Sequence, residues 1–257
     1  MPAPSGSPWL EGWTGFGGTN NWYGGWAGFN YAFNHNVWSD GLLLRAEGGA
    51  GHYDYPTTAL PGGVSNVTYD VGALLLGWRR VLPGFIGQTT TLSGYVGAEV
   101  QDHNNSDPTA AVRGTQWGVK FVGEMYTRLS QYQDFYGQAT FSSAFDTWLL
   151  LARPGWLVPA VSGTEVWIGP DMSVFGNGQG WLVNASHCPN AGTSGTVGGL
   201  GSCKYDEGRI GAFLHFIIPN VPVFGDWIVA GGYRKPLLTN GGPDGYYAQI
   251  GMNFRFY

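Results

Sequence analysis

Charged residues are scarce in this sequence. They make up 11% of its 257 residues, whereas an ordinary soluble domain carries roughly 25%. The 12 basic residues are scattered and the formal net charge is -5, while nucleic-acid binding needs clustered Lys and Arg. The composition therefore argues against a nucleic-acid partner. It also means that something other than a charged surface keeps the chain in its solvent.

Long apolar runs are missing as well. A membrane-spanning helix needs roughly 20 consecutive apolar residues, and the nearest candidate, residues 212–232, is interrupted by His215, two prolines and Asp226. Helical periodicity is nearly absent, since glycine recurs every few residues. The mean hydropathy of -0.10 suits a soluble protein, but a barrel with alternating apolar and polar residues averages to the same value. Periodicity must therefore decide the fold class.

Only two cysteines are present, Cys188 and Cys203, in one segment rich in Gly, Ser, Thr and Asn. A bridge between them is worth roughly 3 kcal/mol in the chain-entropy model and needs an oxidising compartment. The alternative is two free thiols on a loop. The spacing lacks the second Cys/His pair of a zinc site. We expect a disulfide, and neither a metal nor a cofactor.

Strict alternation of apolar and polar residues is abundant. In residues 116–129, Lys120 and Glu124 take one parity while Val119 and Phe121 take the other. In a soluble sandwich the apolar parity would face a core, and in a membrane barrel it would face lipid. The same split recurs in residues 92–101 and 207–218.

Turn residues divide the chain into about twelve such segments, an even number as in bacterial single-chain barrels. The predicted strands are residues 10–18, 22–34, 41–55, 67–82, 89–103, 115–129, 135–145, 147–157, 164–175, 205–218, 226–234 and 245–256.

The connections alternate in character. Compact ones at 35–40, 83–88, 130–134, 159–163 and 219–225 alternate with a set that includes long polar ones at 56–66, 104–114, 177–204 and 235–244. Short periplasmic turns and longer extracellular loops are typical of outer-membrane barrels.

These patterns predict an all-β fold, a transmembrane antiparallel up-and-down β-barrel of about twelve strands with both termini in the periplasm. We expect one domain over residues 1–257, with a disordered segment at 1–8 and a long extracellular loop at 177–204. Residues 1–8 lack the apolar stretch of a signal peptide, so we interpret the sequence as a mature chain with an added start Met.

The last predicted strand carries the sharpest local signal. Every second residue from Tyr246 to Phe256 is apolar. The end of the chain, with Phe254, Phe256 and Tyr257, looks like the C-terminal aromatic signal that the barrel-assembly machinery reads in outer-membrane proteins. We expect this machinery and outer-membrane lipid as partners. The alternative is a soluble amphipathic strand that happens to end the chain.

Aromatic residues near strand ends predict girdles at the two lipid interfaces. They are Trp9, Trp22, Trp38, Tyr53, Tyr55, Trp156, Trp181 and Trp227.

The charged residues of the inward parity are the candidate functional residues. We predict that they form an ion-pair network that seals or narrows the lumen, because pairing lowers the cost of burying charge. The alternative is a polar track for a solute or glycan. No spacing fixes a glycosidase pair or a phospholipase-type Ser–His site, so we expect no catalytic residue. The predicted lumen residues are Glu99, Lys120, Glu124, Arg128, Glu165, Asp171, Glu207, Arg209 and Arg255.

Short motifs in order along most of the chain carry a family resemblance. They include GLLLR at 41–45, GAGHYDY at 49–55, EVQDH at 99–103, GVK at 118–120, SAFD at 143–146, GPD at 169–171 and RIGAF at 209–213. Together they resemble the cellulose biosynthesis protein BcsS family, found beside cellulose synthase components in alphaproteobacteria. A Glu often stands in that family where this chain has Asp171, and residues 177–204 look like an insertion.

The resemblance implies an outer-membrane location, with cellulose or cellulose-secretion components as partners. It supplies no catalytic mechanism and no binding site. We therefore expect a non-catalytic accessory barrel of cellulose biosynthesis or export. The alternatives are a small-solute diffusion channel and an outer-membrane hydrolase. If a glycan is handled, aromatic faces would stack on its rings, and Tyr53, Tyr55 and Trp181 are candidate glycan contacts.

Overall fold

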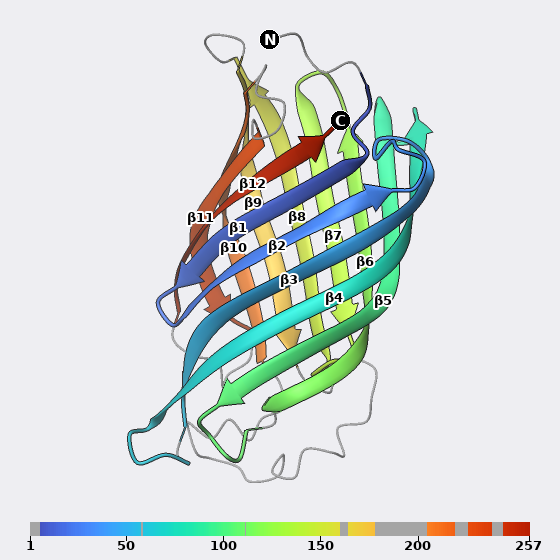
Figure 1. The fold of residues 1–257 in the computed structure, drawn as a ribbon. Helices are drawn as coiled ribbons and strands as arrows, with labels where there is room; N and C mark the ends of the chain where they lie inside the picture. Colours follow the sequence, from blue (N-terminus) through green and yellow to red (C-terminus); the bar gives the residue numbers. More distant parts are fainter. Residues whose placement is uncertain are drawn as a thin grey trace.

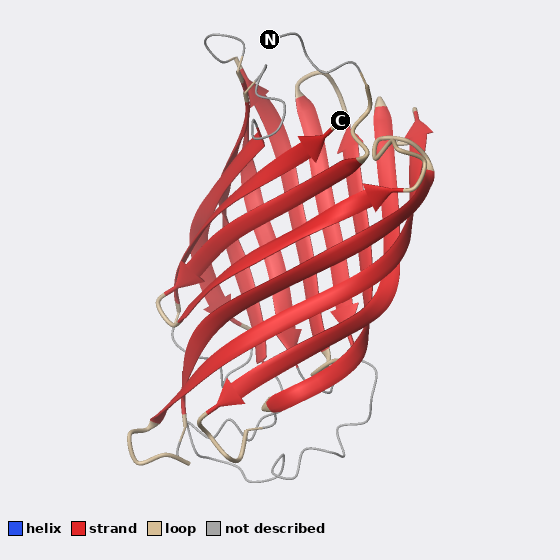
Figure 2. Cartoon of the chain, in the orientation of Figure 1, coloured by secondary structure: helices blue, strands red, loops and turns tan. Residues whose placement is uncertain are grey.

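The computed structural model describes residues 6–57, 59–110, 112–159, 164–177, 205–218, 226–237 and 244–257. In these residues every regular element is a β-strand, as Figure 2 shows. None of the described segments is a helix long and apolar enough to cross a membrane.

The twelve strands follow the chain in order. They are β1 (Leu10–Thr19), β2 (Trp22–Ala32), β3 (Gly41–Pro56), β4 (Val64–Pro83), β5 (Thr89–Asn105), β6 (Gly114–Arg128), β7 (Gln133–Ser142), β8 (Thr147–Val158), β9 (Glu165–Asn177), β10 (Tyr205–Ile217), β11 (Asp226–Pro236) and β12 (Gly245–Phe256).

Each strand pairs antiparallel with its neighbours in the chain, and β1 pairs with β12 to close the ring. The closing register sets Leu10 opposite Phe256 and Thr19 opposite Tyr247. Closure removes the two edge strands that an open sheet would have. The prediction of an all-β, antiparallel, up-and-down barrel of twelve strands is confirmed.

The barrel wall is taller on one side. β4 has 20 residues and β5 has 17, whereas β1 has 10. In Figure 1 the start of β1 and the end of β12 lie at one end of the barrel, and β3, β4 and β5 extend beyond the β1–β2 hairpin at the other end. We call these the terminal end and the loop end.

One predicted strand is too long. The sequence pattern predicts a strand to residue 145, but β7 ends at Ser142 and residues 143–146 form the turn to β8. Phe145 and Asp146 have positive φ values of 53° and 50°. Two left-handed residues in succession are typical of tight hairpin turns whose twist matches that of the strands. Neither is Gly or Asn, so the sequence carried only a weak turn signal.

The outer surface of the barrel is apolar. On β4 the outward side chains Leu74, Leu76 and Trp78 are exposed, Leu74 by 57% of its surface. Trp117 on β6 is 72% exposed. Other strands present further exposed apolar side chains, among them Phe16, Val96, Phe121, Leu150, Ile168, Ile210, Val229 and Ile250.

The inside of the barrel is mixed. Two small apolar cores are buried there, one around Leu43, Leu75 and Val122, the other around Trp167 and Phe213. Most of the remaining inward side chains are polar or charged. An apolar outside and a polar inside reverse the arrangement of a soluble protein.

Candidate functional site in the barrel lumen

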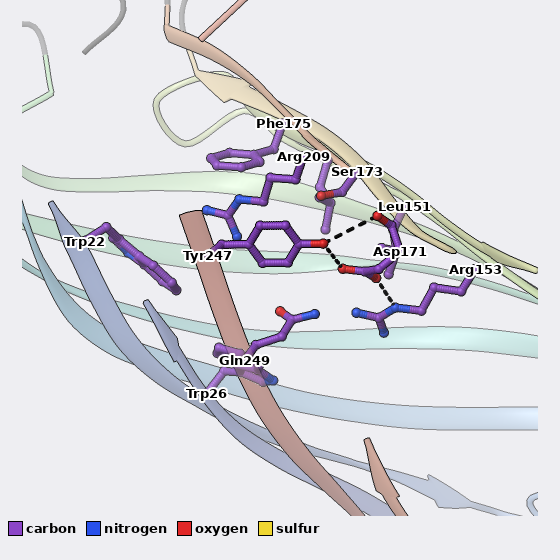
Figure 3. A pocket seen from close by; sticks show the side chains of 11 residues that line it. Trp22, Trp26, Leu151, Arg153, Asp171, Ser173, Phe175, Arg209, Tyr247 and Gln249 are labelled. Carbon is purple, nitrogen blue, oxygen red and sulfur yellow. Dashed lines mark hydrogen bonds and ion pairs between the residues drawn. The ribbon is translucent and has the colours of Figure 1, made fainter. Parts of the chain in front are cut away.

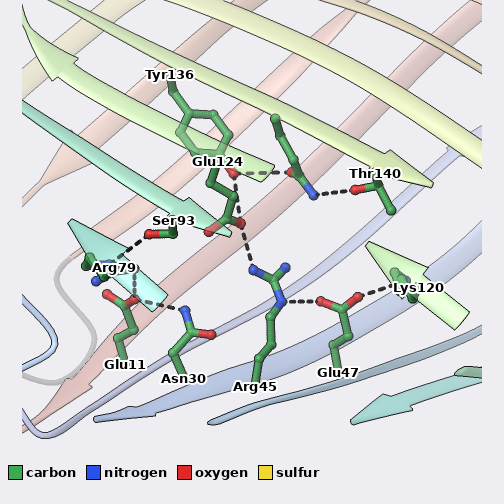
Figure 4. Close-up of polar contacts among 11 residues, drawn as sticks. Glu11, Asn30, Arg45, Glu47, Arg79, Ser93, Lys120, Glu124, Tyr136 and Thr140 are labelled. Atoms are coloured by element: carbon green, nitrogen blue, oxygen red, sulfur yellow. Dashed lines mark hydrogen bonds and ion pairs between the residues drawn. The ribbon is translucent and has the colours of Figure 1, made fainter. Parts of the chain in front are cut away.

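A cluster of charged side chains lies inside the barrel between β1 and β7 (Figure 4). Arg45 on β3 is central to it, with Nε 2.5 Å from Glu47 and Nη1 2.7 Å from Glu124 on β6. Lys120 Nζ lies 2.8 Å from Glu47 and 2.6 Å from Glu99. We define the central ion cluster as Glu11, Arg45, Glu47, Arg79, Glu99, Lys120 and Glu124.

The central ion cluster reaches across the lumen. The Arg45 guanidinium lies over the ring of Trp13 on β1, 4.4 Å from its centroid, a favourable cation–π position. Glu124 accepts a long hydrogen bond of 3.4 Å from the Tyr136 hydroxyl on β7. In a ring of twelve strands, β1 and β7 lie on opposite sides. The chain of contacts therefore bridges the barrel wall to wall.

A second link joins β4 to β1 within the same cluster. Arg79 Nη2 lies 2.7 Å from Glu11, and its Nε donates to the Ser93 hydroxyl at 3.0 Å. Asn30 donates to the same Glu11 carboxylate at 2.9 Å. Four carboxylates thus share three cations, so the burial of charge is largely compensated.

A second group of ion pairs lies on β8 to β12. Arg153 pairs with Asp171, and the Tyr247 hydroxyl donates to the Asp171 carboxylate at 2.8 Å. Glu207 lies 2.7 Å from Arg209 and 2.6 Å from Arg234. We call Arg153, Asp171, Glu207, Arg209 and Arg234 the second ion cluster.

A third, smaller cluster lies toward the terminal end of the lumen. Asp226 on β11 is 2.6 Å from His215 and 2.9 Å from Arg255. Asn253 also donates to Asp226, at 3.1 Å.

The structure places the predicted lumen residues on the inner face. Glu99, Lys120 and Glu124 belong to the central ion cluster, Asp171, Glu207 and Arg209 to the second, and Arg255 to the third. Arg128 and Glu165 belong to none of the three clusters. They meet at Trp167 instead, because Arg128 lies 5.1 Å from the ring centroid and the indole N–H donates to Glu165 at 3.3 Å.

The sequence reasoning missed several members of the clusters. Arg45 and Glu47 follow the parity opposite to Leu42 and Leu44, so alternation within residues 41–55 carried the signal. Arg79 was harder to place because Arg80 stands next to it and takes the outer face, where it pairs with Asp40 at 2.7 Å. The other residues missed were Glu11, Arg153, Arg234 and Asp226.

An aromatic group covers the inner wall toward the loop end. Tyr53 and Tyr55 lie on the same face of β3 as Arg45, and their ring centroids are 6.3 Å apart. The prediction of a lipid-interface girdle is therefore wrong for Trp22, Tyr53 and Tyr55. In the alternation of each strand, these three residues fall on the same side as the inward charged residues. Their aromatic character alone did not show which face of the sheet they occupy.

Other girdle residues do lie on the outer surface. Trp156 and Trp227 are exposed there, whereas Trp38, in the connection after β2, is exposed at the terminal end beside Arg255. Trp181, Cys188 and Cys203 lie outside the described residues, so their roles as glycan contact and disulfide stay predictions.

Phe254 and Phe256 follow the outward parity of Ile250 on β12, and Tyr257 lies just beyond the strand. Phe254 and Phe256 form an edge contact at 5.8 Å, and Tyr257 meets Trp38 at 6.2 Å. Phe256 and Tyr257 are exposed. Their role as an assembly signal stays a prediction.

A cavity of about 150 Å³ lies inside the barrel beside the second ion cluster. Figure 3 shows the aromatic, polar and charged side chains that surround it. It is lined by Trp22, Trp26, Leu149, Leu151, Arg153, Asp171, Ser173, Phe175, Arg209, Tyr247 and Gln249. Within the part of the chain that the structure describes, no group of three or more His, Cys, Asp or Glu residues is arranged to hold a metal ion.

These features define a class: a closed antiparallel barrel of twelve strands with an apolar outside and an ion-paired lumen. The model of the cellulose biosynthesis protein BcsS family matches residues 12–186. Because this match covers more than half of the chain, the chain belongs to the BcsS family. The resemblance stated from the sequence motifs is confirmed.

Several solved structures are similar at low sequence identity. The β domain of the Bordetella autotransporter BrkA has a TM-score of 0.47 and 12% identity, over 98% of this chain and 100% of that one. CdiB from Acinetobacter baumannii has a TM-score of 0.41 and 10% identity, over 96% and 60%. The transport unit of the autotransporter AIDA-I from Escherichia coli has a TM-score of 0.42 and 11% identity, over 96% and 88%. No curated protein matches the chain.

Proposed function

We propose that this protein is a non-catalytic accessory barrel of the outer membrane of a Gram-negative bacterium, and that it acts in cellulose biosynthesis or export. The observation that carries the location is the closed ring of strands with apolar side chains outside and paired charges inside. Membership of the BcsS family supports the proposed association with cellulose.

The closed ring suits hydrocarbon because it satisfies its own backbone. In lipid an unpaired N–H or C=O costs several kcal/mol, so only helices and closed barrels span a bilayer. Here β1 pairs with β12, so that in the described residues each of the twelve strands has a paired neighbour on both sides. The outward side chains, such as Leu74 and Phe121, are exposed in the isolated chain and would gain about 25 cal/mol for each Å² that lipid covers.

The lengths of the connections support the orientation that we propose. Each connection at the terminal end has at most eight residues, whereas the longest connection, residues 178–204, joins β9 to β10 at the loop end. The β1–β2 and β7–β8 connections at the loop end are short. Outer-membrane barrels have short periplasmic turns and longer extracellular loops. We therefore place both termini in the periplasm and the loop end outside the cell.

The lumen chemistry favours an accessory role over hydrolysis. A glycosidase needs one protonated carboxyl group and one carboxylate on either side of the scissile bond. The lumen carboxylates Glu47, Glu99 and Glu124 each have a cation within 2.8 Å. Carboxylates held in such ion pairs stabilise the barrel wall. They are not free to donate a proton to a substrate or to accept one from it.

The test is deletion of the gene in its host with restoration from a plasmid. We expect the chain to fractionate with the outer membrane, and its deletion to lower extracellular cellulose, measured as glucose after acid hydrolysis. The purified barrel should release no reducing ends from cello-oligosaccharides. Unchanged cellulose output, an inner-membrane or soluble location, or measurable hydrolysis would each contradict the proposal.

A further inference from the structure

We propose that the lumen cavity is a binding subsite for one pyranose ring of a neutral glucan, reached from the loop end along a row of aromatic side chains. The choice of a glucan rests on the proposed function. The choice of a neutral sugar ring rests on the size, the lining and the charge balance of the cavity.

The cavity has two unlike walls on opposite sides of the barrel. Trp22 and Trp26 come from β2, and Leu149, Leu151 and Arg153 come from β8. Its volume of about 150 Å³ is that of a protein cavity known to hold one benzene ring. The space therefore limits a ligand to about one ring at this position, with its hydroxyl groups against the polar lining.

Two rings of the inner wall, Trp26 on β2 and Tyr69 on β4, lie close against glycines. A Cβ built on Gly15 would lie 2.6 Å from the Trp26 ring, and one on Gly51 would lie 2.7 Å from the Tyr69 ring. Only glycine lets an aromatic ring approach the backbone this closely. A ring that lies on the wall presents its other face to the lumen, and such faces stack on the C–H faces of sugars.

The polar groups around the cavity suit hydroxyl groups. Asp171 accepts from Tyr247 and pairs with Arg153, yet a carboxylate has about four acceptor sites and a guanidinium five donors. Ser173 and Gln249 add a hydroxyl and an amide. Donors and acceptors alternate around the aromatic walls, as in binding sites with a few placed polar groups.

The charge balance favours a neutral ligand. The two guanidiniums of the cavity already have carboxylate partners, because Arg153 pairs with Asp171 and Arg209 lies 2.7 Å from Glu207. An anionic sugar or a phosphate would have to compete with these carboxylates. A neutral ring needs no such exchange.

A row of aromatic side chains leads from the cavity to the loop end. Trp22 donates to the Tyr69 hydroxyl at 3.0 Å, the rings of Tyr69 and Tyr53 are 6.1 Å apart, and those of Tyr53 and Tyr55 are 6.3 Å apart. His103 stacks on Tyr69 at 5.7 Å. Successive platforms of this kind suit successive rings of one chain. Tyr53 and Tyr55, the glycan contacts expected from the sequence, belong to this row.

The experiment measures binding of cellotetraose to the full-length, detergent-solubilised barrel by calorimetry. The wild type should bind, and Trp22→Ala should raise Kd about tenfold, which corresponds to about 1.4 kcal/mol. Trp117→Ala is the matched control, since it removes the same ring from the outer face and should leave Kd unchanged. Gln249→Met keeps the side-chain size and removes the amide, so it should weaken binding even if Trp22→Ala folds poorly.

Several outcomes would overturn the inference. One is that the wild type does not bind cellotetraose. Another is that Trp22→Ala and Trp117→Ala raise the Kd for cellotetraose equally. Tighter binding of a glucuronate tetramer than of cellotetraose would contradict the inference that the ligand is neutral. If cellotetraose binds as expected but gene deletion leaves cellulose output unchanged, the cavity assignment stands and the proposed function fails. If deletion lowers cellulose but no sugar binds, only the inference fails.

Discussion

At the scale of single residues, pairing explains how charges are tolerated inside the barrel. Glu99 is only 1% exposed, and Lys120 serves both Glu99 and Glu47. Removing one member of a buried ion pair leaves the other charge buried without a partner. The resulting loss of stability exceeds the net stabilisation that the pair contributed.

Lys120→Met should therefore destabilise the barrel by about 3–5 kcal/mol. Adding Glu99→Gln to this variant should restore part of the loss, because it removes one unpaired carboxylate. Urea unfolding followed by tryptophan fluorescence measures both. Lys235→Met is the control, since Lys235 is exposed on β11. Equal unfolding midpoints for Lys120→Met and Lys235→Met would show that the ion pairs of Lys120 do not stabilise the barrel.

Asp107, in the connection after β5, gives a pH-dependent prediction. Burial works to raise the pKa of its carboxyl group, but hydrogen bonds from Thr57 and Thr109 outweigh burial and hold the pKa below its ordinary value. The Thr57 hydroxyl donates at 2.6 Å, and the Thr109 hydroxyl and amide donate at 2.7 and 2.8 Å.

A lowered pKa in the folded state means that the ionised carboxylate stabilises the fold. This contribution is complete above the ordinary Asp pKa of about 3.9 and is lost as the pH falls through the lowered value. Asp107→Asn should lower the unfolding midpoint near neutral pH, and the difference from the wild type should shrink in acid. A difference that stays constant or grows on acidification would contradict this assignment.

At the scale of elements, alternation was enough to place the strands. The predicted and observed bounds differ by three residues or fewer, because a period of two marks every strand that has one polar and one apolar face. A clear misassignment was the turn after β7, which the sequence pattern assigned to the strand. Phe145 and Asp146 have positive φ there, but neither is the Gly or Asn that usually indicates such a turn.

The sequence could not predict which charges meet. Arg45 and Glu124 are 79 positions apart, and their contact depends on the registers of β3, β4, β5 and β6 together. Register sets the height of each residue on the wall, and alternation sets only its face. The inner position of Trp22 was missed for a related reason, because aromatic residues serve on both faces of this barrel.

The β7–β8 turn offers a test of backbone strain. A left-handed conformation costs an ordinary L-residue about 1–2 kcal/mol, and glycine avoids this cost. Asp146→Gly should raise the unfolding free energy by about 0.5–1 kcal/mol after the added flexibility of the unfolded chain is counted. Asp146→Val should lower it, since a β-branched residue tolerates positive φ poorly. Urea midpoints in the reverse order would rule out this turn geometry.

At the scale of the whole molecule, the central ion cluster spans the lumen from wall to wall. Its contacts run from Trp13 on β1 through Arg45 to Glu124 and Tyr136 on β7. The Arg79–Glu11 pair adds a second link, from β4 to β1. A barrel of twelve strands is wider than one that side chains fill completely, so we predict that this bridge closes a lumen that would otherwise conduct.

Single-channel recording in planar bilayers tests this closure and the membrane barrel together. The wild-type barrel should insert without stepwise conductance. The triple variant Arg45→Ser/Glu47→Ser/Glu124→Ser removes both ion pairs between β3 and β6 and leaves Lys120 paired with Glu99. It should insert and give discrete steps. Steady steps from the wild type would contradict a closed lumen, and silence from both proteins would contradict a barrel that spans the bilayer.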